Sequence, residues 1–134
     1  MRSLISGGIL LVLVYCSVGD GPTGSYCGSI DTALGKATIR IAVASPYTAD
    51  IDASWIPRGG QEKRGSVTDV KFEYDAPTGA VTVISLDKVQ ALINMIGAPL
   101  TADMLVHLEY KGNALYVVNL GNYRLDHCSH KVLL

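Results

Sequence analysis

The densest group of reactive side chains lies near the end of the chain, where Asp126, His127, Cys128, Ser129 and His130 are consecutive. Imidazole, carboxylate and thiol groups are all ligands that zinc accepts, and a zinc site needs three or four of them converging. On a strand, however, His127 points away from both of its neighbours, because successive side chains alternate between faces. The sequence therefore predicts no metal site here and favours polar residues beside a disulfide.

Other constellations for catalysis are equally sparse. No Gly-x-Ser-x-Gly nucleophile elbow occurs in the chain, and no glycine-rich phosphate-binding or dinucleotide fingerprint is present. Cys27 and His107 could form a thiol–imidazole pair only if Cys27 carried a free thiol. Asp50 and Asp52 share one face of a predicted strand, as expected for a solvated face. The sequence thus favours a non-enzymatic protein, with no catalytic residue and no cofactor predicted.

The first 19 residues have the three parts of a secretory signal peptide. Arg2 supplies a positive charge, an apolar run follows, and small residues lead to a predicted cleavage point after Gly19. The apolar span 4–18 is shorter than the roughly 20 residues that a membrane helix needs. We therefore expect residues 1–19 to be removed, leaving 20–134 as a single secreted β-rich domain without a membrane contact.

Cleavage would leave two cysteines, Cys27 and Cys128, near opposite ends of the chain. In an oxidising compartment an isolated pair of this kind is expected to form a disulfide. The loop that it closes has about 100 residues, for which the chain-entropy model gives roughly 4.7 kcal/mol of stabilisation. Such a bond requires the two ends of the chain to meet, so it predicts that the first and last strands are neighbours or face one another.

Alternation of apolar and polar residues predicts half-buried strands of an antiparallel sheet over most of the chain. The predicted strands are 26–30, 36–44, 48–55, 67–74, 80–84, 104–110, 114–120 and 123–128. The strand predicted over 114–120 is apolar on both faces, so we expect it to be central in the sheet or covered on both sides. Residues 56–66 are predicted to form a loop because proline, glycine and charged residues gather there, and Lys63-Arg64 within it is a candidate dibasic processing site.

The hydrophobic period changes to that of a helix over residues 86–96. Ser85 is a suitable N-cap, and Gly97 and Pro99 end the helix. A helix of this length persists only when packed against the sheet. The predicted fold is mainly β (all-β or α+β), with about eight short antiparallel strands in a meander forming a barrel or sandwich. The one amphipathic helix is available to cap one end.

Charge and aromatic content narrow the range of partners. The formal net charge is -1, so no field exists to gather phosphates, and nucleic acid is not expected as a partner. The interior of an eight-stranded barrel is either filled by side chains or holds one small ligand. The candidate ligand-lining residues are four aromatic side chains on faces assigned to the interior: Trp55, Phe72, Tyr74 and Tyr110.

The segment Thr23-Gly24-Ser25-Tyr26-Cys27-Gly28 resembles the opening of secreted lipocalin-like proteins, which begin with Gly-x-Trp near the first strand. Tyr26 stands here at the tryptophan position, and the predicted helix lies between middle strands instead of after the barrel. The resemblance assigns no family and transfers no ligand to this chain.

Two functions follow from these observations. The first is a secreted, non-enzymatic β-domain that binds an extracellular partner through its loops, such as 56–66, or through its outer face. The second is a lipocalin-like carrier of a small hydrophobic ligand in a barrel interior. The partner is therefore either an unknown protein or a small hydrophobic molecule.

Overall fold

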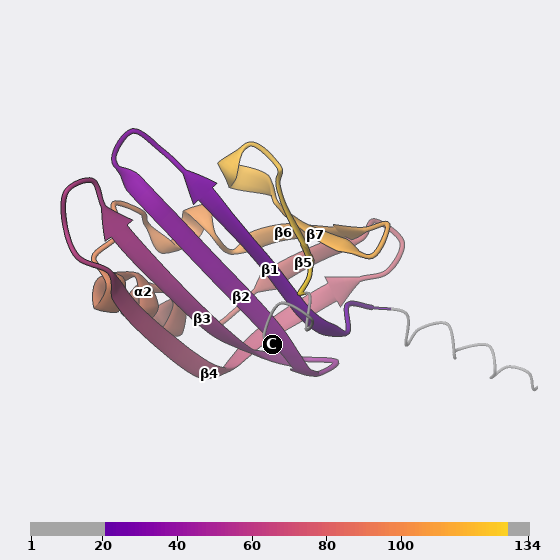
Figure 1. The fold of residues 1–134 in the computed structure, drawn as a ribbon. Coiled ribbons are helices and arrows are strands. Elements are labelled where there is room, and N and C mark those ends of the chain that lie inside the picture. Colours follow the sequence, from indigo (N-terminus) through magenta and orange to yellow (C-terminus); the bar gives the residue numbers. More distant parts are fainter. Residues whose placement is uncertain (1–20, 129–134) are drawn as a thin grey trace, which may run out of the picture.

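A computed structural model describes residues 21–128, which form a closed barrel of eight antiparallel strands arranged in chain order (Figure 1). The strands are β1 (Gly24–Asp31), β2 (Gly35–Ser45), β3 (Thr48–Pro57), β4 (Lys63–Asp75), β5 (Ala80–Val83), β6 (His107–Lys111), β7 (Ala114–Val117) and β8 (Tyr123–His127). The predicted mainly β fold is confirmed, and the barrel, rather than the sandwich, is the form adopted. The predicted signal peptide, Ser129 and His130 lie outside the described residues.

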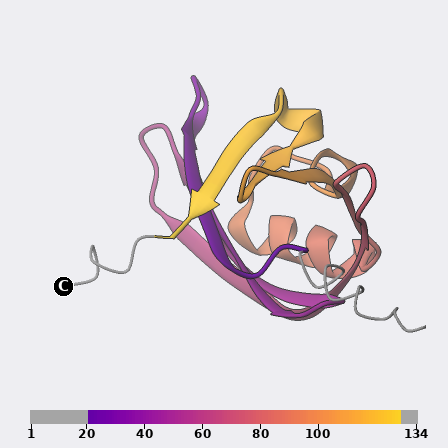
Figure 2. The ribbon, with the colours of Figure 1, turned by 90° about the vertical axis from the view of Figure 1, so that its right-hand side faces the viewer.

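Helix α2 (Leu86–Ile96) connects β5 to β6, as the sequence predicts, and packs mainly on β4. The 3-10 turn η3 (Ala102–Met104) precedes β6, and a second one, η4 (Val118–Leu120), precedes β8. Figure 2 looks along the barrel and shows α2 lying across its far end. The buried stripe of the helix consists of Val89, Leu92, Ile93 and Ile96. Burial of this stripe against the sheet stabilises a helix that is too short to persist alone.

The barrel is closed between β1 and β8 by a short ladder and a disulfide. The register pairs are Tyr26 with His127 and Cys27 with Asp126. Cys27 and Cys128 are bonded, with their Cα atoms 5.0 Å apart, and the amide of Cys128 donates to the carbonyl of Ser25 at 2.9 Å. The predicted disulfide and the predicted meeting of the first and last strands are both confirmed.

Gly28 allows β8 to approach β1 this closely. A Cβ atom at this position would lie 2.5 Å from Cδ2 of Leu125 and 3.4 Å from the carbonyl oxygen of Arg124. Leu125 is completely buried in the core, so it has no space into which it could move. The absence of a side chain on Gly28 is therefore a condition for ring closure.

A bulge in β4 sets where the helix lies. The register between β3 and β4 shifts opposite Asp50, and Asp69 adopts a positive φ of 57° at the shift. The carboxylate of Asp50 accepts a hydrogen bond from the amide of Asp69 at 3.0 Å. Lys88 on α2 donates to the carbonyls of Thr68 and Asp69 at 2.8 and 3.1 Å. The helix is thereby anchored to the bend in β4.

The loop predicted over residues 56–66 is wrong in extent. Strand β3 continues to Pro57, β4 begins at Lys63, and the connection between them is 58–62. Lys63 and Arg64 pair with residues of β3, so the candidate processing site lies in a strand and not in a loop. Gly65 lies within this strand and does not interrupt it. Met95 and Leu92 of the helix occupy the space that a side chain at this position would fill.

Two other predicted strands are shorter than expected. The strand predicted from Met104 begins at His107, since residues 102–104 form η3. The strand predicted over 114–120 ends at Val117, where the chain turns into η4 and reaches Gly121 at a φ of 69°. β7 pairs with β6 on one side and with β8 on the other, so it is central in the sheet, which is one of the two arrangements expected for it. Its second face is not fully covered, since Val118 is 40% exposed. Alternation alone does not reveal where a 3-10 turn replaces the ladder.

We expect the double substitution Cys27→Ser/Cys128→Ser to lower the free energy of unfolding by about 2–5 kcal/mol, because the bond closes a long loop and the adjoining ladder is short. Urea denaturation followed by far-UV circular dichroism measures this change. Addition of a reductant to the wild-type protein is the matched control and should give the same shift. An unchanged denaturation midpoint in both experiments would contradict a structural role for the bond.

Candidate functional site

An apolar pocket of about 230 Å3 lies at the end of the barrel that α2 crosses. We call it the helix-end pocket. Its walls are the inner faces of β1, β2 and β3, the buried stripe of α2, and the segments around η3 and η4. The lining residues are Gly28, Ser29, Ile30, Thr32, Leu34, Ala37, Thr38, Ile39, Ala53, Ser54, Trp55, Leu92, Ile93, Ile96, Pro99, Leu100, Leu105, Val117, Leu120 and Tyr123. None of these side chains is charged.

Trp55 is the single tryptophan of the chain and forms part of the pocket wall. It is 7% exposed and stands opposite Ala37 in the ladder between β2 and β3. Leu34, in the turn between β1 and β2, is 63% exposed although it lines the same pocket. The pocket therefore has a buried aromatic wall and an apolar rim that reaches solvent.

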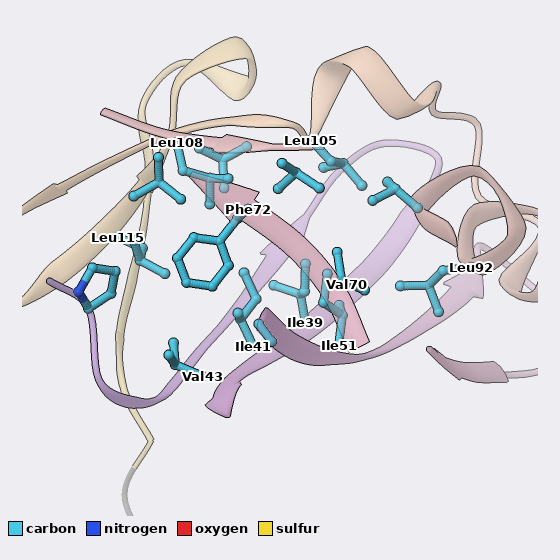
Figure 3. Close-up of a pocket in the computed structure, with 16 residues that line it drawn as sticks. Ile39, Ile41, Val43, Ile51, Val70, Phe72, Leu92, Leu105, Leu108 and Leu115 are labelled. Atoms are coloured by element: carbon cyan, nitrogen blue, oxygen red, sulfur yellow. The ribbon is translucent and has the colours of Figure 1, made fainter. Parts of the chain in front are cut away.

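The centre of the barrel is packed. A cavity of only about 40 Å3 remains there, lined by apolar residues from the sheet and from α2 (Figure 3). Drug-sized ligands occupy sites of roughly 300–1,000 Å3, so this cavity is too small for such a ligand. Four residues line both the central cavity and the helix-end pocket and separate the two spaces: Ile39, Leu92, Leu105 and Val117.

The opposite end of the barrel is closed by tyrosines. Tyr26 is completely buried, and its ring meets the ring of Tyr110 edge-on, with centroids 6.3 Å apart. Tyr110 packs in the same way on Tyr74, at 6.0 Å. The amide of Thr23 donates to the hydroxyl of Tyr26 at 3.1 Å. Burial raises the pKa of Tyr26 to about 12, an effect that the hydrogen bond from Thr23 opposes and the neighbouring Tyr110 reinforces.

The four aromatic residues proposed from sequence do not converge on one site. Trp55 lines the helix-end pocket, and Phe72 lines the central cavity. Tyr74 borders two hollows at the tyrosine end. Tyr110 packs between Tyr26 and Tyr74 in that closed end. Of the four, only Trp55 lies at the helix-end pocket.

Sequence reasoning missed most of the lining of this pocket. Leu34, Pro99, Leu100 and Leu120 lie in turns or 3-10 segments, where an alternating pattern gives no inward face. Ile93 and Ile96 lie in the predicted amphipathic helix, where the helical spacing of apolar residues indicates a buried face. The part of the barrel that this buried face contacts could not be predicted from one sequence, because the bulge in β4 determines where the helix lies.

The terminal cluster of potential ligands is dispersed. Cys128 is in the disulfide, and the ring of His127 stacks on Tyr26 with centroids 4.5 Å apart. The carboxylate of Asp126 accepts a hydrogen bond from Nε of Arg124 at 2.6 Å. Within residues 21–128, no group of three or more histidine, cysteine, aspartate or glutamate side chains is placed to hold a metal ion.

Comparison with protein families, with curated proteins and with solved structures found no match for this chain. Among the residues that the structure describes, no helix is long and apolar enough to cross a membrane. The fold and the site define a small disulfide-closed β-barrel with one apolar pocket at its helix end. This form is consistent with a small binding domain.

We expect Tyr26 to make stability depend on pH in the alkaline range. Its folded-state pKa of about 12 exceeds the ordinary value of 10.0, so the neutral hydroxyl is favoured by folding. This stabilisation is complete below pH 10 and is lost as the pH rises toward 12. Tyr26→Phe should reduce the decline of the unfolding free energy over this range, measured by urea denaturation. Tyr47→Phe, at an exposed tyrosine, should keep the wild-type decline; equal declines in all three proteins would refute the assignment.

Proposed function

We propose that the protein is a small secreted binding domain whose helix-end pocket takes one small, uncharged, apolar ligand. The observation that carries this proposal is an apolar pocket of about 230 Å3 bordered by Trp55 and the apolar stripe of α2. An engineered apolar cavity of about 150 Å3 is known to bind benzene, and typical drug-sized sites begin near 300 Å3. The size of the pocket therefore suits a ligand of one to three small rings or a short branched hydrocarbon.

The polar groups of the pocket support an uncharged ligand. The hydroxyl of Thr32 donates to the carbonyl of Gly35 at 2.9 Å. The hydroxyls of Thr38 and Ser54 lie on the outer face of the sheet and are hydrogen-bonded to each other there. A charged ligand would lose its hydration on entering and would meet no charged partner, which is strongly unfavourable. An apolar ligand would remove apolar surface from water at no such cost.

Secretion is part of the same proposal. The predicted signal peptide, residues 1–19, and the disulfide between Cys27 and Cys128 both fit an oxidising extracellular compartment. A disulfide of this kind would not persist among reduced cytosolic thiols. A protein that binds an apolar ligand has a role in extracellular fluid, because such a ligand dissolves poorly in water and needs a carrier there.

A second candidate function is binding of an extracellular protein through the outer face of β1–β4. A polar hollow of about 790 Å3 lies there, lined by Cys27, Gly28, Ser29, Thr38, Ile39, Arg40, Asp52, Ala53, Ser54, Arg64, Gly65 and Ser66. Arg40 and Asp52 face each other across the ladder and are both exposed. The 58–62 connection is much shorter than the predicted loop, so the outer face supports this candidate better than the loops do.

We expect the wild-type protein to bind 1-aminoanthracene, a neutral fused-ring fluorophore, with saturable energy transfer from Trp55. Ala37→Leu extends a side chain into the pocket and should weaken binding at least tenfold, because it occupies the space of the ligand. Ala42→Leu is the matched control: Ala42 lies on the opposite face of the same strand and outside the pocket, so its affinity should equal that of the wild type. Equal weakening by both substitutions, or no saturable binding, would overturn the proposal.

For the second candidate, we expect Arg40→Glu to weaken capture of a partner from extracellular fluid, because it reverses a charge in the outer hollow. Lys36→Glu makes the same change on the same strand outside the hollow and should leave capture intact. Quantitative mass spectrometry of the captured proteins provides the measurement. A set of captured proteins that neither substitution alters would argue against the outer face as an interface.

A further inference from the structure

We infer that the ligand enters the helix-end pocket through the gap between β1 and β8, and that Tyr123 is the latch of this entrance. This inference rests on the proposed function of the pocket and deepens it. It assigns a role to Tyr123, a residue that the sequence analysis did not single out.

The gap is a consequence of unequal pairing along β1. On one side, β1 pairs with β2 along its whole length, from Gly24 to Asp31. On the other side, it pairs with β8 at Tyr26 and Cys27. Figure 2 shows the end of β8 (yellow) meeting β1 (indigo) at the left side of the ring, with the two strands diverging above that point. Residues 29–31 therefore present a strand edge toward η4 and the start of β8.

The gap leads directly into the pocket. Gly28, Ser29 and Ile30 line the pocket from the β1 side, and Leu120 and Tyr123 line it from the η4 and β8 side. The chain leaves the ladder at η4 and returns as β8 only at Tyr123, after Gly121 and Asn122 adopt positive φ values of 69° and 58°. No backbone ladder spans this stretch of the described barrel.

Tyr123 reaches across the gap. Its ring is half-buried in the pocket wall, and its hydroxyl donates a hydrogen bond to the carbonyl of Ser29 on β1. This carbonyl belongs to the strand edge that β8 does not pair, so the tyrosine hydroxyl takes the place of a ladder bond. A neutral hydrogen bond contributes little free energy. Its loss is therefore expected to raise the population of molecules with an open entrance by about twofold to tenfold.

Hydrogen bonds hold together the segments that cover the pocket. The amide of Ala102 in η3 donates to Gln90 on α2 at 3.2 Å, and Asn119 in η4 donates to the carbonyl of Asp103 at 2.9 Å. These bonds join α2, η3 and η4 into one cover. The tyrosine end is filled by buried Tyr26, so it offers no passage. Between this end of the barrel and the unpaired edge of β1, the hydrogen bond in place is the one from Tyr123 to Ser29.

The disulfide fixes the lower end of the gap. Cys27 and Cys128 tie β1 to the end of β8 just below the point where the strands diverge. Widening of the gap above would therefore pivot on this bond and leave the ring closed. An entrance of this kind admits a flat apolar molecule without unfolding the barrel.

Stopped-flow mixing with 1-aminoanthracene, followed by energy transfer from Trp55, tests the entrance. We expect Tyr123→Phe to raise both the association and the dissociation rate constants by about twofold to tenfold. The Kd should stay within a factor of two, because the substitution removes only the hydroxyl and keeps the ring in the pocket wall. Tyr123→Leu, which also shortens the side chain, should raise both rates further. Tyr116→Phe is the control, since its hydroxyl bonds Arg124 outside the pocket, and it should leave the rates unchanged.

The outcomes separate the two proposals. Saturable binding with rates that neither Tyr123 substitution alters would overturn the entrance alone and leave the pocket function standing. A wild-type protein that does not bind the fluorophore would overturn both. A Kd weakened by Tyr123→Phe with unchanged association would also overturn the latch, because it would make Tyr123 a ligand contact. Urea denaturation of each variant confirms that the compared proteins are folded.

Discussion

Ring closure between β1 and β8 is the constraint on which the rest of the barrel depends. The other neighbouring strands are joined by ladders between successive segments, whereas this one joins opposite ends of the chain. Gly28 gives β8 room to approach, and the bond between Cys27 and Cys128 holds the two strands together. Closure pairs part of the two edges that an open sheet would expose. Because the closing ladder is short, the same arrangement leaves the gap above it.

The pocket depends on a second local feature, the bulge in β4. Asp50 on β3 accepts a hydrogen bond from the bulge, and Lys88 on α2 donates hydrogen bonds to it. These bonds fix the position of α2 across the barrel end. From there its buried stripe faces the ends of β1–β3 without filling the space between them. An irregularity in one strand therefore determines the volume that the barrel offers to a ligand.

Much of the fold could be predicted from the sequence because its causes are local. Alternation predicts the strands, the stripe and Gly97 predict the helix, and an isolated cysteine pair predicts the disulfide. Residues 63–66 were misassigned because the place of Gly65 in a strand depends on Leu92 and Met95 of a distant helix. The site was harder to predict for the same reason: most of its lining comes from turns, and the aromatic side chains are distributed over both ends of the barrel.

The chain-order topology also has a consequence for how the protein folds. Seven of the eight strand pairings join consecutive strands, and the eighth spans almost the whole described chain. Local pairings form early, whereas a pairing of such long range carries a large loop-closure entropy and forms late. During synthesis β8 is also the last strand of the described barrel to leave the ribosome. The ring therefore closes only after β8 has emerged, and oxidation of Cys27 and Cys128 marks that closure.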